Sequence, residues 1–224
     1  MTDAQRPPIR AVWTDFGGVL TPPVGQTLAA FCRRIGVPPA AYLDAWWRVT
    51  VGYGTDDIME PLDTPLVIER EWLRQVGAIL RADHGITLRL TTMADAWFDD
   101  RETNDAWVRR LRQLRADGLF VGLLSNMVPS WDAHWRRMVD PDLFADVVLS
   151  FQVGCRKPGP RIFELAARRA GLEPRECLLV DDMAKNCDGA RAAGWQALQF
   201  TDTDAAIAEL DRLLPSTLTT EAAS

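Results

Sequence analysis

Short runs of apolar residues alternate with amphipathic stretches along much of this chain. The first run covers 11–14 and stops at Asp15. Four later runs are also short, apolar and bounded by polar residues or glycine, as buried strands are; they cover 119–125, 146–150, 177–182 and 195–200. Helical patterns accompany them at 131–139, 160–171, 184–194 and 202–214. This alternation predicts an α/β fold in which helices wrap a parallel sheet.

Residues 24 to 100 have a different pattern, because their apolar positions recur at helical spacing and no strand stands out. The clearest helical stretches are 27–36, 38–52, 70–85 and 91–100. This segment leaves the sheet beside Asp15 and returns before the second strand, so we expect a helical lid over that end of the sheet. The predicted divisions are a core of 1–22 and 101–216, an all-helical cap of 23–100, and a tail of 217–224.

Composition and charge narrow the class of protein. The chain has 224 residues, of which 47% are hydrophobic and 25% charged, and this suits one core with an inserted subdomain. Its net charge of −6 argues against a nucleic-acid-binding surface, so an anionic substrate needs a local positive site. With no membrane-length apolar segment and no signal-like start, we expect a cytoplasmic monomer or homodimer that binds no membrane.

Carboxylates follow the first and fourth of the apolar runs. Asp15 precedes Gly17 and Gly18, which let backbone N–H groups approach an oxyanion closely. Asp181 and Asp182 end a buried run, where adjacent carboxylates repel each other unless a cation or a lysine neutralises them. Such carboxylates bind Mg²⁺ or attack phosphorus as nucleophiles. Taken alone, however, Asp15 is more typical of a residue that starts a turn.

Two further polar clusters lie between these carboxylates. Ser125 and Asn126 end the second run and offer a hydroxyl and an N–H group to phosphate oxygens, although this pair is also typical of a loop or a helix cap. The ammonium group of Lys157 can neutralise both an aspartate and a phosphoryl group, whereas a single lysine is most often solvated. Because parallel strands end at one edge of a sheet, the ordered set predicts a metal and phosphate site there.

Taken together, these clusters resemble the four ordered motifs of the haloacid dehalogenase superfamily, over about residues 10 to 213. The branch that contains glucose-1-phosphate phosphatases and the N-terminal phosphatase domain of soluble epoxide hydrolase is the most similar. The segments that carry this likeness are DFGGVLT (15–21), GCRKPGPRIF (154–163) and VDDMAKNCDGARAAGW (180–195). The resemblance implies a Rossmann-like core with a helical cap, and Mg²⁺-dependent hydrolysis of a small phosphorylated metabolite such as a sugar phosphate.

The resemblance also implies roles for individual residues. Asp15 would be the nucleophile that forms an aspartyl-phosphate, with Lys157 as the second catalytic residue. Mg²⁺ would be held by the Gly17 carbonyl and by the carboxylates of Asp15 and Asp182, with Asp181 close behind. The phosphoryl group would be bound by Gly17, Gly18, Ser125, Asn126 and Lys157. Asn186 matches the loop after the fourth motif.

One position departs from the family pattern. Most phosphatases of the superfamily have a second aspartate two residues after the nucleophile, where it protonates the leaving group and later activates water. Here that position is Gly17, and the loss of a general acid costs about 10²–10⁴-fold in rate unless another group replaces it. We therefore expect either a substrate with a better leaving group, such as a sugar 1-phosphate, or a proton donor on the cap.

Two other functions remain open at this point. A phosphate-binding protein with weak or no activity is favoured by Gly17 alone. A 2-haloacid dehalogenase is disfavoured, because dehalogenases of the superfamily lack the metal-binding aspartate pair and have a bulky aromatic residue where Gly17 stands.

The cap is expected to contact the substrate. Trp46, Arg48 and Tyr53 are candidates for lining the pocket, with Arg48 or Tyr53 contacting polar groups of the substrate. The alternative is that Trp46 is simply buried within the helical bundle.

Overall fold

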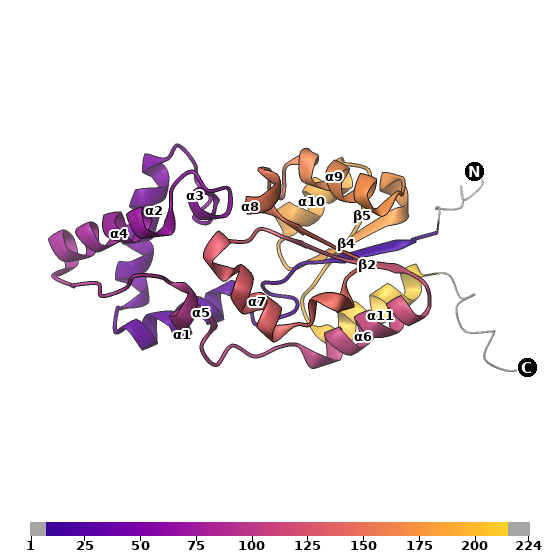
Figure 1. Ribbon diagram of the computed structural model, residues 1–224, viewed down its shortest axis with the longest axis horizontal. Coiled ribbons are helices and arrows are strands. Elements are labelled where there is room, and N and C mark those ends of the chain that lie inside the picture. The colour runs from indigo at the N-terminus through magenta and orange to yellow at the C-terminus, as the bar shows by residue number, and fades with distance from the viewer. Residues whose placement is uncertain (1–7, 215–224) are drawn as a thin grey trace, which may run out of the picture.

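A parallel sheet of five strands lies at the centre of the larger lobe of the computed structural model, which describes residues 8–214 (Figure 1). The strand order is β3-β2-β1-β4-β5, and every neighbouring pair is parallel. The strands are β1 (Ala11–Thr14), β2 (Phe120–Ser125), β3 (Asp146–Leu149), β4 (Cys177–Asp181) and β5 (Gln196–Gln199). The predicted α/β fold with a helix-flanked parallel sheet is confirmed.

β1 and β4 are apolar up to their last residue because both of their faces are covered. All residues of β1 and β4 are buried, as expected for a parallel sheet between two helical layers. Thr14 lies opposite Leu123 of β2 and Val180 of β4. These strands therefore end at nearly the same level, so the polar residues that follow them meet at one edge.

Helices cover both faces of this sheet (Figure 1). One face packs against α6 (Asp105–Ala116) and α11 (Thr203–Leu213), and the other packs against α9 (Pro160–Ala170) and α10 (Ala184–Ala192). Successive residues of β1 divide between these layers, since Val12 belongs to the first hydrophobic cluster and Trp13 to the second. The remaining elements of the core are α7 (Asp132–Met138), α8 (Ser150–Val153) and short 3₁₀ turns at Pro129–Trp131, Pro141–Leu143 and Pro174–Glu176.

A group of helices between β1 and α6 forms the smaller lobe (Figure 1). These are α1 (Val24–Ile35), α2 (Pro39–Gly52), α3 (Glu60–Asp63), α4 (Glu69–His84) and α5 (Ala94–Phe98), and no strand occurs within residues 24–100. Aromatic side chains fill its interior, in edge-to-face contacts with centroids 5.2–6.4 Å apart; they are Phe31, Tyr42, Trp46, Trp72 and Trp97. Below we call this group the cap.

The two chain segments that connect the cap to the sheet lie side by side. Asn104, the N-cap of α6, donates its backbone N–H to Leu20 O and its side-chain amide to Val19 O, at 2.8 and 3.0 Å. The same amide donates to the Thr203 hydroxyl, while the Asn104 Oδ1 accepts from the backbone N–H of Trp107. The Asn104 side chain, which lies on the segment returning from the cap, thus contacts both the outgoing segment at Val19 and the core residue Thr203.

The predicted tail, 217–224, lies outside the described residues. Across residues 8–214, no helix has the length and apolar character that crossing a bilayer requires.

Candidate active site

The turn after β1 brings its backbone against the end of β4. The N–H of Phe16 donates to Asp15 Oδ1 at 2.7 Å, which holds the carboxylate at the start of the turn. Gly18 has a φ of 80°, and a Cβ atom there would lie only 2.1 Å from Asp182 Oδ2. Glycine is required at position 18 both for this left-handed conformation and for the close approach of Asp182.

Lys157 is fully buried between two carboxylates. Its Nζ lies 3.0 Å from Asp15 Oδ1 and 2.5 Å from Asp181 Oδ2. Burial disfavours the ammonium form, but the charges of Asp15 and Asp181 outweigh this effect and raise the pKa of Lys157. A buried charge is tolerated only with such pairing, so Lys157 is a fixed positive charge beside Asp15.

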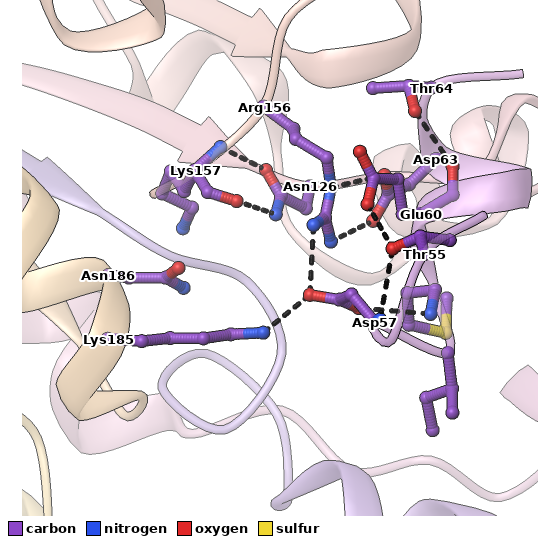
Figure 2. A network of polar contacts seen from close by, with 12 residues as sticks. Thr55, Asp57, Glu60, Asp63, Thr64, Asn126, Arg156, Lys157, Lys185 and Asn186 are labelled. Carbon is purple, nitrogen blue, oxygen red and sulfur yellow. Dashed lines mark hydrogen bonds and ion pairs between the residues drawn. The ribbon is translucent and has the colours of Figure 1, made fainter. Parts of the chain in front are cut away.

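The Asn126 side chain holds the backbone of Lys157 in place (Figure 2). The Lys157 N–H donates to Asn126 Oδ1, and the Asn126 amide donates to the Lys157 carbonyl, both at 2.9 Å. Ser125, which precedes Asn126 at the end of β2, is buried and lines the same cavity as Asp15. The two residues predicted from the second cluster are therefore both at the site.

Three carboxylates converge at this edge of the sheet. Asp15, Asp181 and Asp182 each offer an oxygen within 4.8 Å of the others. The Asp181 carboxylate already accepts hydrogen bonds from Lys157, the Asn186 side chain and the Met183 backbone. The Asp182 carboxylate forms no ion pair or hydrogen bond with another side chain of residues 8–214, and so remains available to a ligand.

The electrostatics of Asp182 fit a bound cation. Burial, followed by the negative charges of Asp15 and Asp181, raises the pKa of Asp182 to about 7. Burial also raises the pKa of Asp15, against the opposing charge of Lys157. The Asn186 Oδ1 at the same site is buried without a hydrogen-bond partner in the described chain. A hard divalent cation with oxygen ligands suits this donor set.

A cavity of about 270 Å³ extends from these carboxylates to the space beneath the cap. Its polar lining near the sheet comprises Asp15, Ser125, Asn126, Asp182 and Asn186. Most of its other lining residues are apolar: Phe16, Val24, Ile58, Met59, Trp97, Met127, Trp131 and Met183. Two of these meet across the boundary between the lobes, since the indole of Trp97 on α5 stacks on Trp131 of the core at 5.0 Å and 18°.

On one side of the cavity, charged residues join the cap to the core (Figure 2). Arg156 of the core donates to both oxygens of Asp63 on α3, at 2.8 and 2.9 Å, and to Asp57 at 2.9 Å. Lys185 forms a second ion pair with Asp57. Burial opposes the charge of Asp57, but the hydrogen bonds from Arg156 and Lys185 prevail and lower its pKa to about 2. Burial raises the pKa of Asp63 to about 6 despite the Arg156 guanidinium.

The cap residues proposed from the sequence lie away from this cavity. Trp46 is fully buried in the bundle and donates its indole N–H to Ile58 O, because its position on α2 faces the helical interior. Arg48 is exposed and pairs with Asp83 on α4. The Tyr53 hydroxyl accepts a hydrogen bond from Gln75. Trp46 thus lies within the helical bundle, and none of Trp46, Arg48 and Tyr53 lines the cavity.

Arg101 is the cavity residue that the sequence analysis missed most clearly. It follows α5, and its guanidinium lies 5.2 Å from the ring centroid of Phe98 and 5.3 Å from that of Phe16. Burial lowers the pKa of Arg101 to about 10, so it stays cationic at neutral pH. The sequence feature that could have pointed to Arg101 is its position at the end of the cap, but the residues next to it form no recognisable motif.

Comparison with known proteins places this site in a family. The model of haloacid dehalogenase-like hydrolases matches residues 9–194. A protein described as phosphatase MT3486, from Mycobacterium tuberculosis, is 39% identical over 197 residues, covering 84% of this chain and 86% of that protein. Phosphoserine phosphatase of Thermus thermophilus is 33% identical over 136 residues, covering 58% of this chain. This chain spans 51% of the Thermus enzyme and 19% of mouse acyl-CoA dehydrogenase family member 10, to which it is 26% identical.

Solved structures share the fold at lower identity. An enzyme of this family from Bacteroides thetaiotaomicron, in complex with magnesium and inorganic phosphate, has a TM-score of 0.59 and 22% identity, covering 85% of this chain and 93% of that one. L-2-haloacid dehalogenase of Xanthobacter autotrophicus has a TM-score of 0.61 and 18% identity, covering 92% and 85%. With the family match spanning most of its length, this chain belongs to the haloacid dehalogenase-like hydrolases.

Proposed function

We propose that this protein is a Mg²⁺-dependent phosphatase that hydrolyses a small organic phosphate through an aspartyl-phosphate on Asp15. The observation that carries the proposal is the position of the Asp15 carboxylate, which borders the cavity. Lys157 Nζ lies 3.0 Å from Asp15 Oδ1, and an oxygen of the Asp182 carboxylate lies within 4.8 Å of one of Asp15. The phosphatase relatives from Mycobacterium and Thermus support the same reaction class.

The reaction has two steps. An oxygen of Asp15 attacks phosphorus, the bond from phosphorus to the leaving oxygen breaks, and its electron pair stays on that oxygen, which then takes a proton from solvent. Water then attacks phosphorus and releases Asp15, giving inorganic phosphate. Lys157 offsets the negative charge brought together in both steps, and Ser125 and the Asn126 backbone hold phosphoryl oxygens.

Asp15, Asp182 and the Gly17 carbonyl are the proposed metal ligands. When bound, Mg²⁺ would neutralise the phosphoryl oxygens and so let the anionic nucleophile approach. Asp181 supports these groups from behind, because it holds both Lys157 and Asn186. In this proposal Asp181 is a positioning residue, since its carboxylate is already engaged.

The test is phosphate release from a broad panel of phosphate monoesters in the presence of Mg²⁺. We expect turnover that EDTA abolishes and Mg²⁺ restores, and that Asp15→Asn reduces by at least about 10³-fold without changing the folded state. The matched control is Asp95→Asn, which alters an exposed carboxylate of the cap. No turnover with any ester would overturn the proposal.

Gly17 favours one other function, a phosphate-binding protein without turnover. The same panel distinguishes it, because such a protein would bind inorganic phosphate with Mg²⁺ and release none from esters.

A further inference from the structure

The cavity beneath the cap offers few groups for a polar substrate. Phe16, Met127 and Trp131 of the core face Ile58, Met59 and Trp97 of the cap. The hydroxyl groups of a sugar would lose their hydrogen bonds to water against such walls and gain few in return, which is unfavourable. An apolar group of similar size would instead gain from leaving water.

Most charged residues at the cavity wall are already satisfied by one another. Arg156 is bound by Asp57 and Asp63, and Lys185 is bound by Asp57. Asp56 is exposed at this wall. Among the described residues that line the cavity, and apart from the catalytic groups, the positively charged side chain left for a ligand is that of Arg101, which is half-buried.

Arg101 has donors without acceptors. Within the described part of the chain it forms no ion pair, and its Nε is buried without a hydrogen-bond partner. A Cβ atom built on Gly17 would lie 3.8 Å from Arg101 Nη2. The guanidinium therefore lies beside the position where an acid two residues after the nucleophile would meet the leaving oxygen.

We propose that this site takes phosphate monoesters of apolar, weakly basic alcohols, of which aryl phosphates are the simplest, and that Arg101 stabilises the charge on the leaving oxygen. The proposal rests on the proposed function and names its substrate class. It also accounts for Gly17, because an aryl oxygen can leave as an anion without a general acid.

The step is balanced without another reactant. The bond between phosphorus and the aryl oxygen breaks as Asp15 attacks, and its electron pair stays on the aryl oxygen beside Arg101. A phenolic oxygen has a pKa of about 10, so the aryloxide takes a proton from water after it departs. The aromatic ring of the leaving group packs among Phe16, Trp97 and Trp131, where edge and face contacts between rings are favourable.

The experiment measures kcat and kcat/KM for phenyl phosphates whose substituents vary the leaving-group pKa, beside glucose 1-phosphate and glycerol phosphate. In the wild-type protein we expect kcat/KM for the aryl esters to exceed that for the polar esters by at least about 10²-fold. Arg101→Met should lower kcat by about 10²-fold for the poorest aryl leaving groups, as when one charge-stabilising donor is removed, and only slightly for the best.

Two variants make the result specific. Arg101→Lys keeps a charge and should restore part of the loss, whereas Arg48→Met removes an exposed arginine outside the cavity and should change nothing. If Arg101→Met is too unstable to assay, the steepened dependence on leaving-group pKa must appear in Arg101→Lys. A merely structural role would lower all rates equally.

The outcomes separate this proposal from the one on which it rests. Equal or faster turnover of the polar esters, or a uniform loss across the aryl series in the Arg101 variants, overturns the aryl assignment and leaves a phosphatase. Absence of turnover for every ester overturns both.

Discussion

Gly17 and Gly18 follow the proposed nucleophile, but the backbone geometry requires glycine at only one of these two positions. The backbone at position 17 does not require glycine, since a Cβ atom would meet only Val24 at 3.6 Å and Arg101 at 3.8 Å, which are ordinary contacts. Gly18 is different, because a Cβ atom there would collide with Asp182. Of two adjacent glycines, only Gly18 is required by the geometry, so Gly17 can be replaced.

We expect Gly17→Asp to raise the turnover of esters with poor leaving groups. The new carboxyl group would stand beside the leaving oxygen and supply the missing proton, an effect worth about 10²-fold in kcat for alkyl esters and little for nitrophenyl esters. Rates for both ester classes check this, with Gly17→Asn as a control of equal size. A uniform loss across leaving groups would contradict the expectation.

At the scale of elements, the interface between cap and core depends on contacts between residues that lie far apart in the sequence. Arg156, which lies between α8 and α9, binds Asp63 of α3 across 93 positions of the chain. The Asp63 side chain is fully buried, and the Arg156 side chain is 11% exposed. Water therefore screens this ion pair far less than it screens pairs on the surface.

We expect Arg156→Met to lower the free energy of unfolding by about 3–5 kcal/mol, because it leaves Asp63 buried without its partner. In this variant Asp57 keeps its ion pair with Lys185, so only Asp63 loses its partner. Urea unfolding provides the measurement. Arg169→Met is the matched control, since it breaks an exposed pair with Asp146 and should cost no more than about 1 kcal/mol. Similar decreases in the free energy of unfolding for the two variants would show that the buried ion pair stabilises the protein no more than the surface pair does.

The elements and the catalytic edge could be predicted because their signals are local. Asp15, Ser125 and Asp181 each stand at the end of an apolar run, and parallel strands bring such ends together. Arg101 and Arg156 gave no comparable signal, because their roles depend on how the cap docks. Arg48 shows the converse error: it is close in sequence to buried cap residues, yet it faces solvent on α2.

At the scale of the whole molecule, the stability of the folded protein depends on whether the Asp182 carboxylate is protonated. The pKa of Asp182 is raised from 3.8 to about 7 in the folded protein. Between pH 3.8 and about pH 7, Asp182 is protonated in the folded state and ionised in the unfolded state. The protonated Asp182 therefore contributes to the stability of the folded state at low pH, and this contribution is lost as the pH rises through about 7. A cation bound to the ionised carboxylate would compensate for that loss.

We therefore expect saturating Mg²⁺ to raise Tm more at pH about 8 than at pH about 6, since protons compete with the metal below about 7. Thermal unfolding with and without Mg²⁺ at both values measures this. Asp182→Asn should remove most of the Mg²⁺ effect at the higher pH. An equal rise in Tm at both values would show that Asp182 does not titrate in this range.

The stacked indoles of Trp97 and Trp131 provide a spectroscopic signal that depends on how the cap lies on the core. One belongs to the cap and the other to the core, at a centroid separation of 5.0 Å. Aromatic rings this close couple their electronic transitions, and any hinge rotation that parts the lobes uncouples them. Near-ultraviolet circular dichroism would therefore detect such a rotation in the unlabelled protein.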